Sequence, residues 1–110
     1  TLSSSSAASD VYKRQTKAGV HSLMQSCAVA LGRHGIRCNS VLPGTIATDI
    51  NKDDLADPNK RQYMEGRIPL GRLGRPEDIA SVVAFLSSDM ASYMSGAALL
   101  VDGGAFANFQ

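Results

Sequence analysis

Residues 97–101 (AALLV) form a continuous apolar run of strand length, and the Asp-Gly-Gly turn at 102–104 ends it. A half-exposed strand alternates apolar and polar residues, whereas a strand of a parallel sheet is apolar on both faces. This run therefore predicts a strand that is buried on both faces. A second short run, residues 36–42, stops at Pro43-Gly44 and predicts a strand followed by a loop.

Residues 16–31 have the pattern of an amphipathic helix. Apolar side chains recur there at steps of three and four residues, namely Val20, Leu23, Met24, Cys27 and Leu31. Gly32 and Gly35 follow, and they are expected to end the helix. An apolar face of this kind suits either the core of the protein or a contact with a second subunit. The pattern leaves both interpretations open.

Residues 45–75 predict loops with short helical pieces. Asp57-Pro58 is expected to start one of them, because aspartate caps a helix and proline fits its first position. Pro76 is expected to start a longer helix. The expected buried face of that helix consists of Ile79, Val82, Val83 and Leu86.

The order of these segments is helix, strand, loop, helix, strand, which predicts an α/β fold with a parallel sheet. Two parallel strands cannot cover their helices, and both strand sequences call for neighbours. The chain is therefore expected to be the C-terminal part of a larger doubly wound domain.

Residues 1–15 differ from the rest of the chain. Five of the first nine residues are serine, and residues 10–15 (DVYKRQ) have no helical or strand periodicity. Serine-rich starts of this kind are typical of linkers or of sequence foreign to the domain. We therefore predict a non-native segment at 1–15 and the domain portion at 16–110.

Composition excludes several classes of protein. A net charge of +1 gives no basic surface for nucleic acid, and no apolar run approaches the ~20 residues of a membrane helix. Cys27 and Cys38 stand without a CxxC motif, which excludes a disulfide framework or zinc finger and fits a reducing compartment. We expect a cytoplasmic protein with no nucleic-acid or membrane partner. No metal site is expected either, because the aspartates between 53 and 57 are typical of helix caps.

Four motifs occur in order: TKAGV at 16–20, GIRCNSVLPG at 35–44, PLGRLGRPEDIA at 69–80, and the segment 96–104. Together they closely resemble the C-terminal half of the classical short-chain dehydrogenases/reductases. The resemblance covers residues 16 to about 104. It implies a Rossmann-type doubly wound parallel sheet, incomplete here with two strands, that binds NAD or NADP at the carboxyl ends of its strands. It also implies a homo-oligomer, either a dimer or a tetramer.

The resemblance further implies a Tyr-x-x-x-Lys pair in which tyrosine is the general acid/base. The lysine binds the nicotinamide ribose and lowers the pKa of the phenol. Lys17 matches this lysine, because Ala-Gly-Val follows it. Tyr12 does not match, because it lies five residues before Lys17, about 140° away around a helix, and Lys13 stands at the tyrosine position. The family's glycine-rich phosphate loop and catalytic serine have no match, so the chain as written is expected to be inactive.

Residues 43–48 (PGTIAT) resemble the family loop that closes over the cofactor. By this resemblance the cofactor-binding residues are Lys17, Pro43, Gly44, Ile46 and Thr48. The Ile46 backbone would meet the nicotinamide carboxamide, and the Thr48 hydroxyl would bond the carboxamide or the phosphates. The alternative is a plain turn with a helix cap at Thr48 or Asp49. Residues 49–68 would form a substrate lid.

Residues 51–57 and the neighbouring Lys60-Arg61 resemble the sugar dehydrogenases of this family. The expected function is hydride transfer from a sugar or alcohol hydroxyl to nicotinamide, with an aldose such as L-rhamnose oxidised to its lactone. One alternative is another substrate of the same fold, for instance a 3-oxoacyl thioester. A second alternative, from a different class, is a non-catalytic α/β fragment that serves only in oligomerisation.

Overall fold

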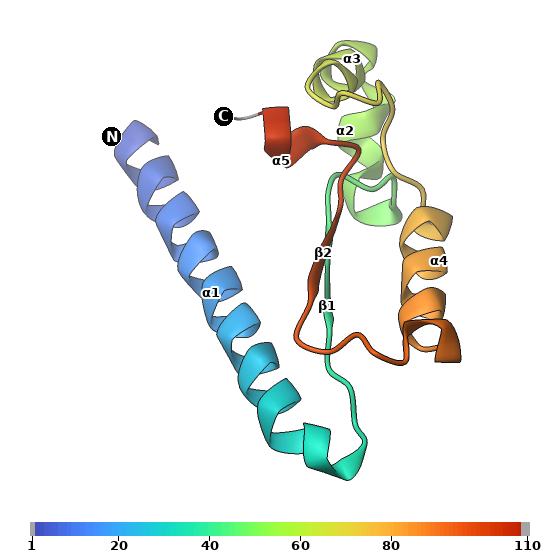
Figure 1. Ribbon diagram of the computed structural model, residues 1–110. Coiled ribbons are helices and arrows are strands. Elements are labelled where there is room, and N and C mark those ends of the chain that lie inside the picture. The colour runs from blue at the N-terminus through green and yellow to red at the C-terminus, as the bar shows by residue number, and fades with distance from the viewer. Residues whose placement is uncertain (1, 109–110) are drawn as a thin grey trace. The chain divides into compact units, whose positions relative to one another are not determined.

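The computed structural model describes the backbone of residues 2–108 and the side chains of residues 15–108 (Figure 1). The elements in chain order are α1 (Leu2–Leu31), η1 (Gly32–His34), β1 (Ser40–Pro43), η2 (Asp49–Asn51), α2 (Lys52–Ala56), α3 (Pro58–Gly66), α4 (Pro76–Leu86), η3 (Asp89–Ala91), β2 (Ala98–Val101) and α5 (Ala105–Asn108), where η marks a 3-10 helix. The chain divides into two compact units. The first holds Thr1–Ser40 with Tyr93–Ala98, and the second holds Val41–Ser92 with Leu99–Gln110.

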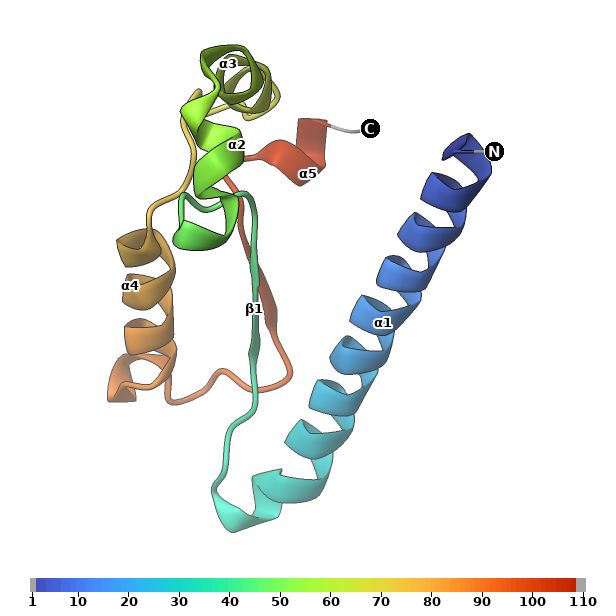
Figure 2. The same cartoon turned by 180° about the vertical axis from the view of Figure 1, so that it is seen from behind.

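Helix α1 begins at Leu2, far ahead of the predicted start at residue 16, and continues unbroken to Leu31 (Figure 2). No glycine or proline occurs between residues 2 and 18, and alanine, lysine, arginine and glutamine there all favour helix. The predicted end is confirmed, because Gly35 has a φ of 73° and its N–H donates to the Gly32 carbonyl. Tyr12 lies on this helix, and its side chain falls outside the described ones.

The predicted apolar face of α1 is only partly covered. Met24 is 8% exposed, whereas Val20 is 60% exposed and Leu23 is 65% exposed. Ala28 lies close to Gly96, where an added Cβ would be 3.8 Å from the alanine methyl carbon. This face therefore keeps exposed apolar surface within its unit.

Strands β1 and β2 form a two-stranded parallel sheet, which confirms the α/β prediction. The Ser40 N–H donates to the Ala97 carbonyl over 2.8 Å, and the Gly44 N–H donates to the Val101 carbonyl over 3.0 Å. The two bonds advance together along both strands, as parallel pairing requires.

Strand β1 begins at Ser40, later than the predicted start at residue 36. Residues 37–39 are irregular because side chains satisfy much of their hydrogen bonding with residues 94–97. Asn39 Nδ2 donates to the Met94 carbonyl over 3.0 Å, and Asn39 Oδ1 accepts from the Ala97 N–H over 3.0 Å.

Burial on both faces of β2 was predicted and is wrong for this structure, because Leu100 is 54% exposed. The predicted buried face of α4 is also only half-buried, with Val83 at 47% exposure. Within the described part of the chain each strand has one strand partner, so the other edge and much of the faces stay open. Among the side chains that the structure describes, the buried apolar ones are Met24, Ile68, Leu73 and Ala91.

The helix starts predicted at Asp57-Pro58 and at Pro76 are confirmed, because α3 begins at Pro58 and α4 begins at Pro76. The Asp57 carboxylate accepts from the Asn59 N–H over 2.9 Å and starts α3, with Pro58 in the first turn. Ser88 Oγ accepts from the Met90 N–H over 3.2 Å and starts η3. Among the described residues no helix combines the length and apolarity needed to span a membrane, and no three metal-ligating side chains gather.

Candidate functional site

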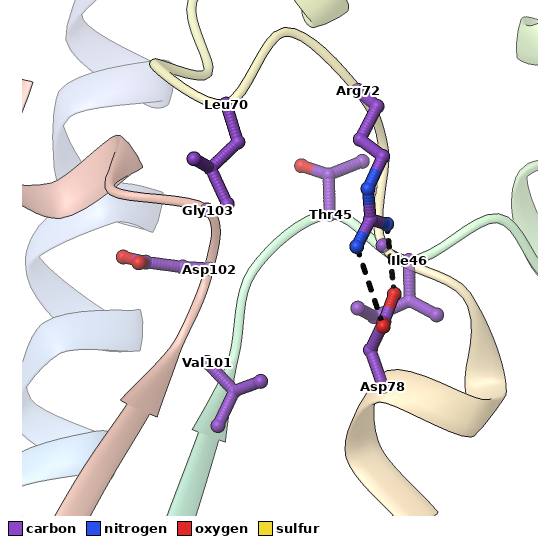
Figure 3. Close-up of a pocket in the computed structure, with 9 residues that line it drawn as sticks. Thr45, Ile46, Leu70, Arg72, Asp78, Val101, Asp102 and Gly103 are labelled. Carbon is purple, nitrogen blue, oxygen red and sulfur yellow. Dashed lines mark hydrogen bonds and ion pairs between the residues drawn. The ribbon is translucent and has the colours of Figure 1, made fainter.

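A cavity of about 160 Å³ lies in the second unit, at the carboxyl ends of β1 and β2 (Figure 3). Val101 ends β2, and Thr45 and Ile46 follow β1, so both strand ends contribute to the wall. Arg72 and Asp78 line another side of it. The carboxyl ends of parallel strands are where α/β sheets bind their ligands, which makes this edge the candidate site.

Gly44 has a structural reason to be glycine at the end of β1. A Cβ built on it would lie 2.7 Å from the Cα of Asp102, closer than real Cβ atoms come to backbone. Gly44 is also one of the predicted cofactor-binding residues. In this structure the close approach is made by Asp102, which allows the two strand ends to meet. Pro43 is the last residue of β1 and is exposed.

Ile46 forms an isolated parallel bridge with Gly74. The Gly74 N–H donates to the Thr45 carbonyl over 3.0 Å, and the Ala47 N–H donates to the Gly74 carbonyl over 2.9 Å. In a parallel bridge of this pattern, the residue between the two bonds turns its own N–H and C=O to the opposite side. The Ile46 peptide groups therefore face away from Gly74 and present one donor and one acceptor.

Thr48 stands in extended backbone immediately before η2, at the position of an N-cap residue, and its side chain is exposed. Its N–H donates to Asn51 Oδ1 over 2.9 Å, while Asn51 Nδ2 donates to the Ile46 carbonyl over 2.8 Å. Sequence reasoning missed Asn51. The signal that could have found it is the Thr-x-x-Asn spacing, which resembles a capping box with asparagine as the third residue.

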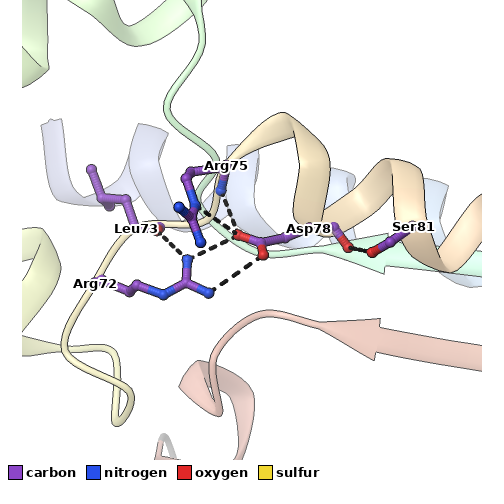
Figure 4. A network of polar contacts seen from close by, with 5 residues as sticks. All are labelled: Arg72, Leu73, Arg75, Asp78 and Ser81. Atoms are coloured by element: carbon purple, nitrogen blue, oxygen red, sulfur yellow. Dashed lines mark hydrogen bonds and ion pairs between the residues drawn. The ribbon is translucent and has the colours of Figure 1, made fainter.

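Arg72 and Arg75 gather around Asp78 at the start of α4 (Figure 4). Arg72 makes two bonds to the carboxylate, of 2.9 and 3.4 Å, and the Arg75 N–H donates to it over 2.7 Å. The hydrogen bond from Arg72 is the main cause that holds the pKa of Asp78 down at about 2. The same pairing raises the pKa of Arg72. Both arginines thus act as ion-pair partners of Asp78.

This network predicts an acid-dependent loss of stability. The pKa of Asp78 is lower in the folded state, so its contribution is present above the ordinary carboxyl pKa of ~4 and is lost as the pH falls toward about 2. We expect the melting temperature of the Asp78→Asn variant to fall less than that of the unsubstituted protein over this interval. Circular dichroism melts at a series of pH values measure this, with Asp53→Asn as the control. Parallel slopes for all three proteins would contradict the prediction.

The structure places the predicted site residues in two groups. Pro43, Gly44, Ile46 and Thr48 lie on one loop of the second unit, next to the strand ends. Lys17 is exposed on α1 in the first unit. The loop residues are therefore the part of the predicted site whose mutual geometry the structure gives.

A parallel sheet with a Pro-Gly loop at its carboxyl edge is the architecture that the sequence motifs imply. Residues 2–105 match the family whose model is described as enoyl-(acyl carrier protein) reductase. The chain belongs to this family of short-chain dehydrogenases/reductases. The resemblance and the Rossmann-type fold predicted from the sequence are thereby confirmed.

Three relatives within this family illustrate how similar the chain is to characterised dehydrogenases and to a solved structure. The chain is 75% identical over 95 residues to an L-rhamnose 1-dehydrogenase (NAD(P)(+)) of Sphingomonas sp. (strain SKA58), covering 86% of this chain and 37% of that protein. It is 52% identical over 92 residues to the (3R)-3-hydroxyacyl-CoA dehydrogenase of Mus musculus, covering 83% and 34%. The crystal structure of an Agrobacterium tumefaciens dehydrogenase with bound NADP is 42% identical, with a TM-score of 0.76 over 83% of this chain and 37% of that one. The chain thus spans little more than a third of the length of these relatives.

Proposed function

We propose that the protein carrying this chain is an NAD(P)-dependent oxidoreductase that acts on the anomeric hydroxyl of an aldose, with L-rhamnose as its substrate. The C1 hydrogen leaves as hydride to the oxidised nicotinamide, the hydroxyl proton goes to a general base, and the product is a lactone. The 75% identity to an L-rhamnose 1-dehydrogenase over 86% of the chain carries this proposal. The matched length is large enough to take in most of the predicted substrate lid.

The loop residues fit a nicotinamide cofactor. Bound NAD or NADP would supply the hydride acceptor. The Ile46 N–H faces away from the Gly74 bridge and makes no hydrogen bond among the described residues. The Ile46 carbonyl accepts from Asn51 and keeps a second lone pair, and the Thr48 hydroxyl lies two residues further along the loop. A primary carboxamide has donors and an acceptor that complement these groups. Ile46 and Thr48 would hold this group, Pro43 and Gly44 would set the course of the loop, and Lys17 would bind the ribose.

Tyr12 is not part of this proposal as the acid/base. Helix α1 is continuous from Leu2 to Leu31, so positions 12 and 17 lie about 140° apart around its axis. We propose instead that residues 1–15 lie outside the domain. The match to the L-rhamnose 1-dehydrogenase of Sphingomonas sp. is 95 residues long, the number from 16 to 110, which supports this boundary. The family match starts at residue 2.

A homo-oligomer and a cytoplasmic location complete the proposal, and both stay predictions. The exposure of Val20 and Leu23 on α1 supports a contact with a second copy of the protein.

The proposal is tested by supplying the purified intact protein with L-rhamnose and either NAD⁺ or NADP⁺. Absorbance of the reduced nicotinamide reports turnover. A 3-hydroxyacyl-CoA thioester is the competing substrate, because the chain is 52% identical to a (3R)-3-hydroxyacyl-CoA dehydrogenase. Turnover of L-rhamnose but not of the thioester is expected. Turnover of the thioester alone would show that the substrate is an acyl thioester and not a sugar.

A further inference from the structure

The Asn51 side chain connects the two ends of the short segment 46–48. Its Nδ2 donates to the Ile46 carbonyl over 2.8 Å, and its Oδ1 accepts from the Thr48 N–H over 2.9 Å. Asn51 is half-buried, which limits competition from water for both bonds. A planar amide that bonds residue i and residue i+2 fixes the extended backbone between them. The segment is therefore ordered by the chain itself, before any ligand binds.

The group that Asn51 presents to this segment is itself a primary carboxamide. The segment thus already accepts the functional group that the proposed cofactor would bring to it. Asn51 does not use all of the available bonds. The Ile46 N–H makes no hydrogen bond within the described part of the chain, and a carbonyl oxygen has a second lone pair. A donor and an acceptor remain for a ligand.

We propose that Asn51 is a positioning residue for the nicotinamide: its amide holds the Ile46 carbonyl and the Thr48 N–H so that the loop is preorganised for the cofactor carboxamide. The inference rests on the proposed function, since it assumes that this loop receives NAD or NADP. Preorganisation raises affinity because the loop is already ordered, so binding does not lose the entropy of ordering it.

Helix capping is the competing role for Asn51, because its Oδ1 accepts from the Thr48 N–H as in a capping box of η2, and because this residue also precedes α2. Its side chain makes no capping hydrogen bond to α2. Aspartate and asparagine are about equally good N-cap residues, so a capping role would survive the Asn51→Asp substitution. The positioning role would not survive, because a carboxylate only accepts hydrogen bonds. It can still receive the Thr48 N–H, but it loses the bond to the Ile46 carbonyl and faces that oxygen with negative charge.

Asn39 offers a matched control in the first unit. Its Nδ2 donates to the Met94 carbonyl and its Oδ1 accepts from the Ala97 N–H, each over 3.0 Å. Asn39 is also half-buried. The Asn39→Asp substitution therefore makes the same chemical change to the same kind of backbone bridge, at a place outside the cofactor loop.

The experiment titrates NADH and NADPH into the intact protein and follows the fluorescence of the reduced nicotinamide. Melting temperatures are measured alongside. We expect Asn51→Asp to weaken cofactor binding about five- to tenfold, the effect of one hydrogen bond. Asn39→Asp is expected to lower the melting temperature without changing cofactor affinity. Where Asn51→Asp does not fold, Asn51→Leu removes both bonds without adding charge, and a similar or larger loss of affinity is expected.

The outcomes separate this inference from the function on which it rests. If the unsubstituted protein binds neither NADH nor NADPH, the proposed function fails and the inference fails with it. If it binds one of them and a folded Asn51→Asp binds equally well, the positioning role alone is overturned. Tighter binding by Asn51→Asp would show that Asn51 competes with the carboxamide, which also overturns the positioning role. An equal loss of affinity in Asn39→Asp would show that the loss in Asn51→Asp comes from a general loss of stability, and the positioning role would be overturned.

Discussion

Replacing Lys17 by methionine in the intact protein is expected to lower kcat for aldose oxidation by about 10²–10⁴-fold, the usual contribution of acid–base catalysis. Lys17 is exposed on α1, and methionine has a similar helix propensity, so the helix should form equally well. The loss arises because the proposed lysine holds the nicotinamide ribose and lowers the pKa of the catalytic phenol. Without its charge that pKa returns toward the ordinary value of ~10, and the pH optimum moves to the alkaline side.

Steady-state kinetics over a range of pH measure this effect, and circular dichroism checks the fold. Arg33→Met is the control, because it removes another exposed cation from the same unit. Its kcat and pH profile should match those of the unsubstituted protein. A folded Lys17→Met variant that keeps the original kcat and pH optimum would remove Lys17 from the catalytic machinery.

The Gly44→Ala substitution is expected to destabilise the protein by about 1–3 kcal/mol, the usual result of overpacking. The new Cβ would stand 2.7 Å from the Asp102 Cα, and backbone cannot swing aside as the end of a flexible side chain does. The ends of β1 and β2 would have to separate, which weakens the bond from the Gly44 N–H to the Val101 carbonyl. Urea unfolding of the intact protein measures the change in the free energy of unfolding.

Gly19→Ala is the matched control for this prediction. Gly19 lies within α1, and a Cβ added there would meet no atom within 4 Å. Alanine should stabilise the helix there by about 0.5–1 kcal/mol, because glycine loses more backbone entropy on folding. Equal stability of Gly44→Ala and the unsubstituted protein would mean that the strand ends are not packed as closely as described.

Helix starts were the most predictable features of this fold. Asp57 and Ser88 each accept a hydrogen bond from the N–H two residues later, so the chemistry of the cap is contained in a few neighbouring residues. Pro58 and Pro76 add a fixed φ at the first turn. Such signals can be read from sequence because no distant residue has to be known.

Features set by distant residues were predicted less well. The start of β1 depends on Asn39, whose amide bonds residues 94 and 97, more than fifty positions away. Burial of Leu100 and Val83 was overestimated, because an apolar run predicts a covering surface without showing whether it is present. The start of α1 was missed for another reason: serine-rich composition outweighed the absence of any helix breaker.

At the candidate site, too, features set by neighbouring residues were predicted and features set by distant residues were not. The loop at 43–48 could be located from its motif, and the spacing of Pro43-Gly44 after a strand placed it at the carboxyl edge. The close approach of Asp102 to Gly44 could not be predicted, since it depends on how two distant strands end together. The Thr-x-x-Asn spacing could have indicated the bond between Asn51 and Thr48, whereas the bond from Asn51 to the Ile46 carbonyl depends on the path of the backbone through residues 46–48, which no residue type specifies alone.

The central claim is that the loop after β1 receives a nicotinamide cofactor, and amide hydrogen exchange of the intact protein tests it most directly. Exchange is compared with and without saturating NADH or NADPH. The Ile46 N–H makes no hydrogen bond within the described residues. Its exchange should therefore slow markedly when a carboxamide oxygen accepts a hydrogen bond from it. Unchanged exchange across residues 43–48, in a protein shown to have bound the cofactor, would contradict this account.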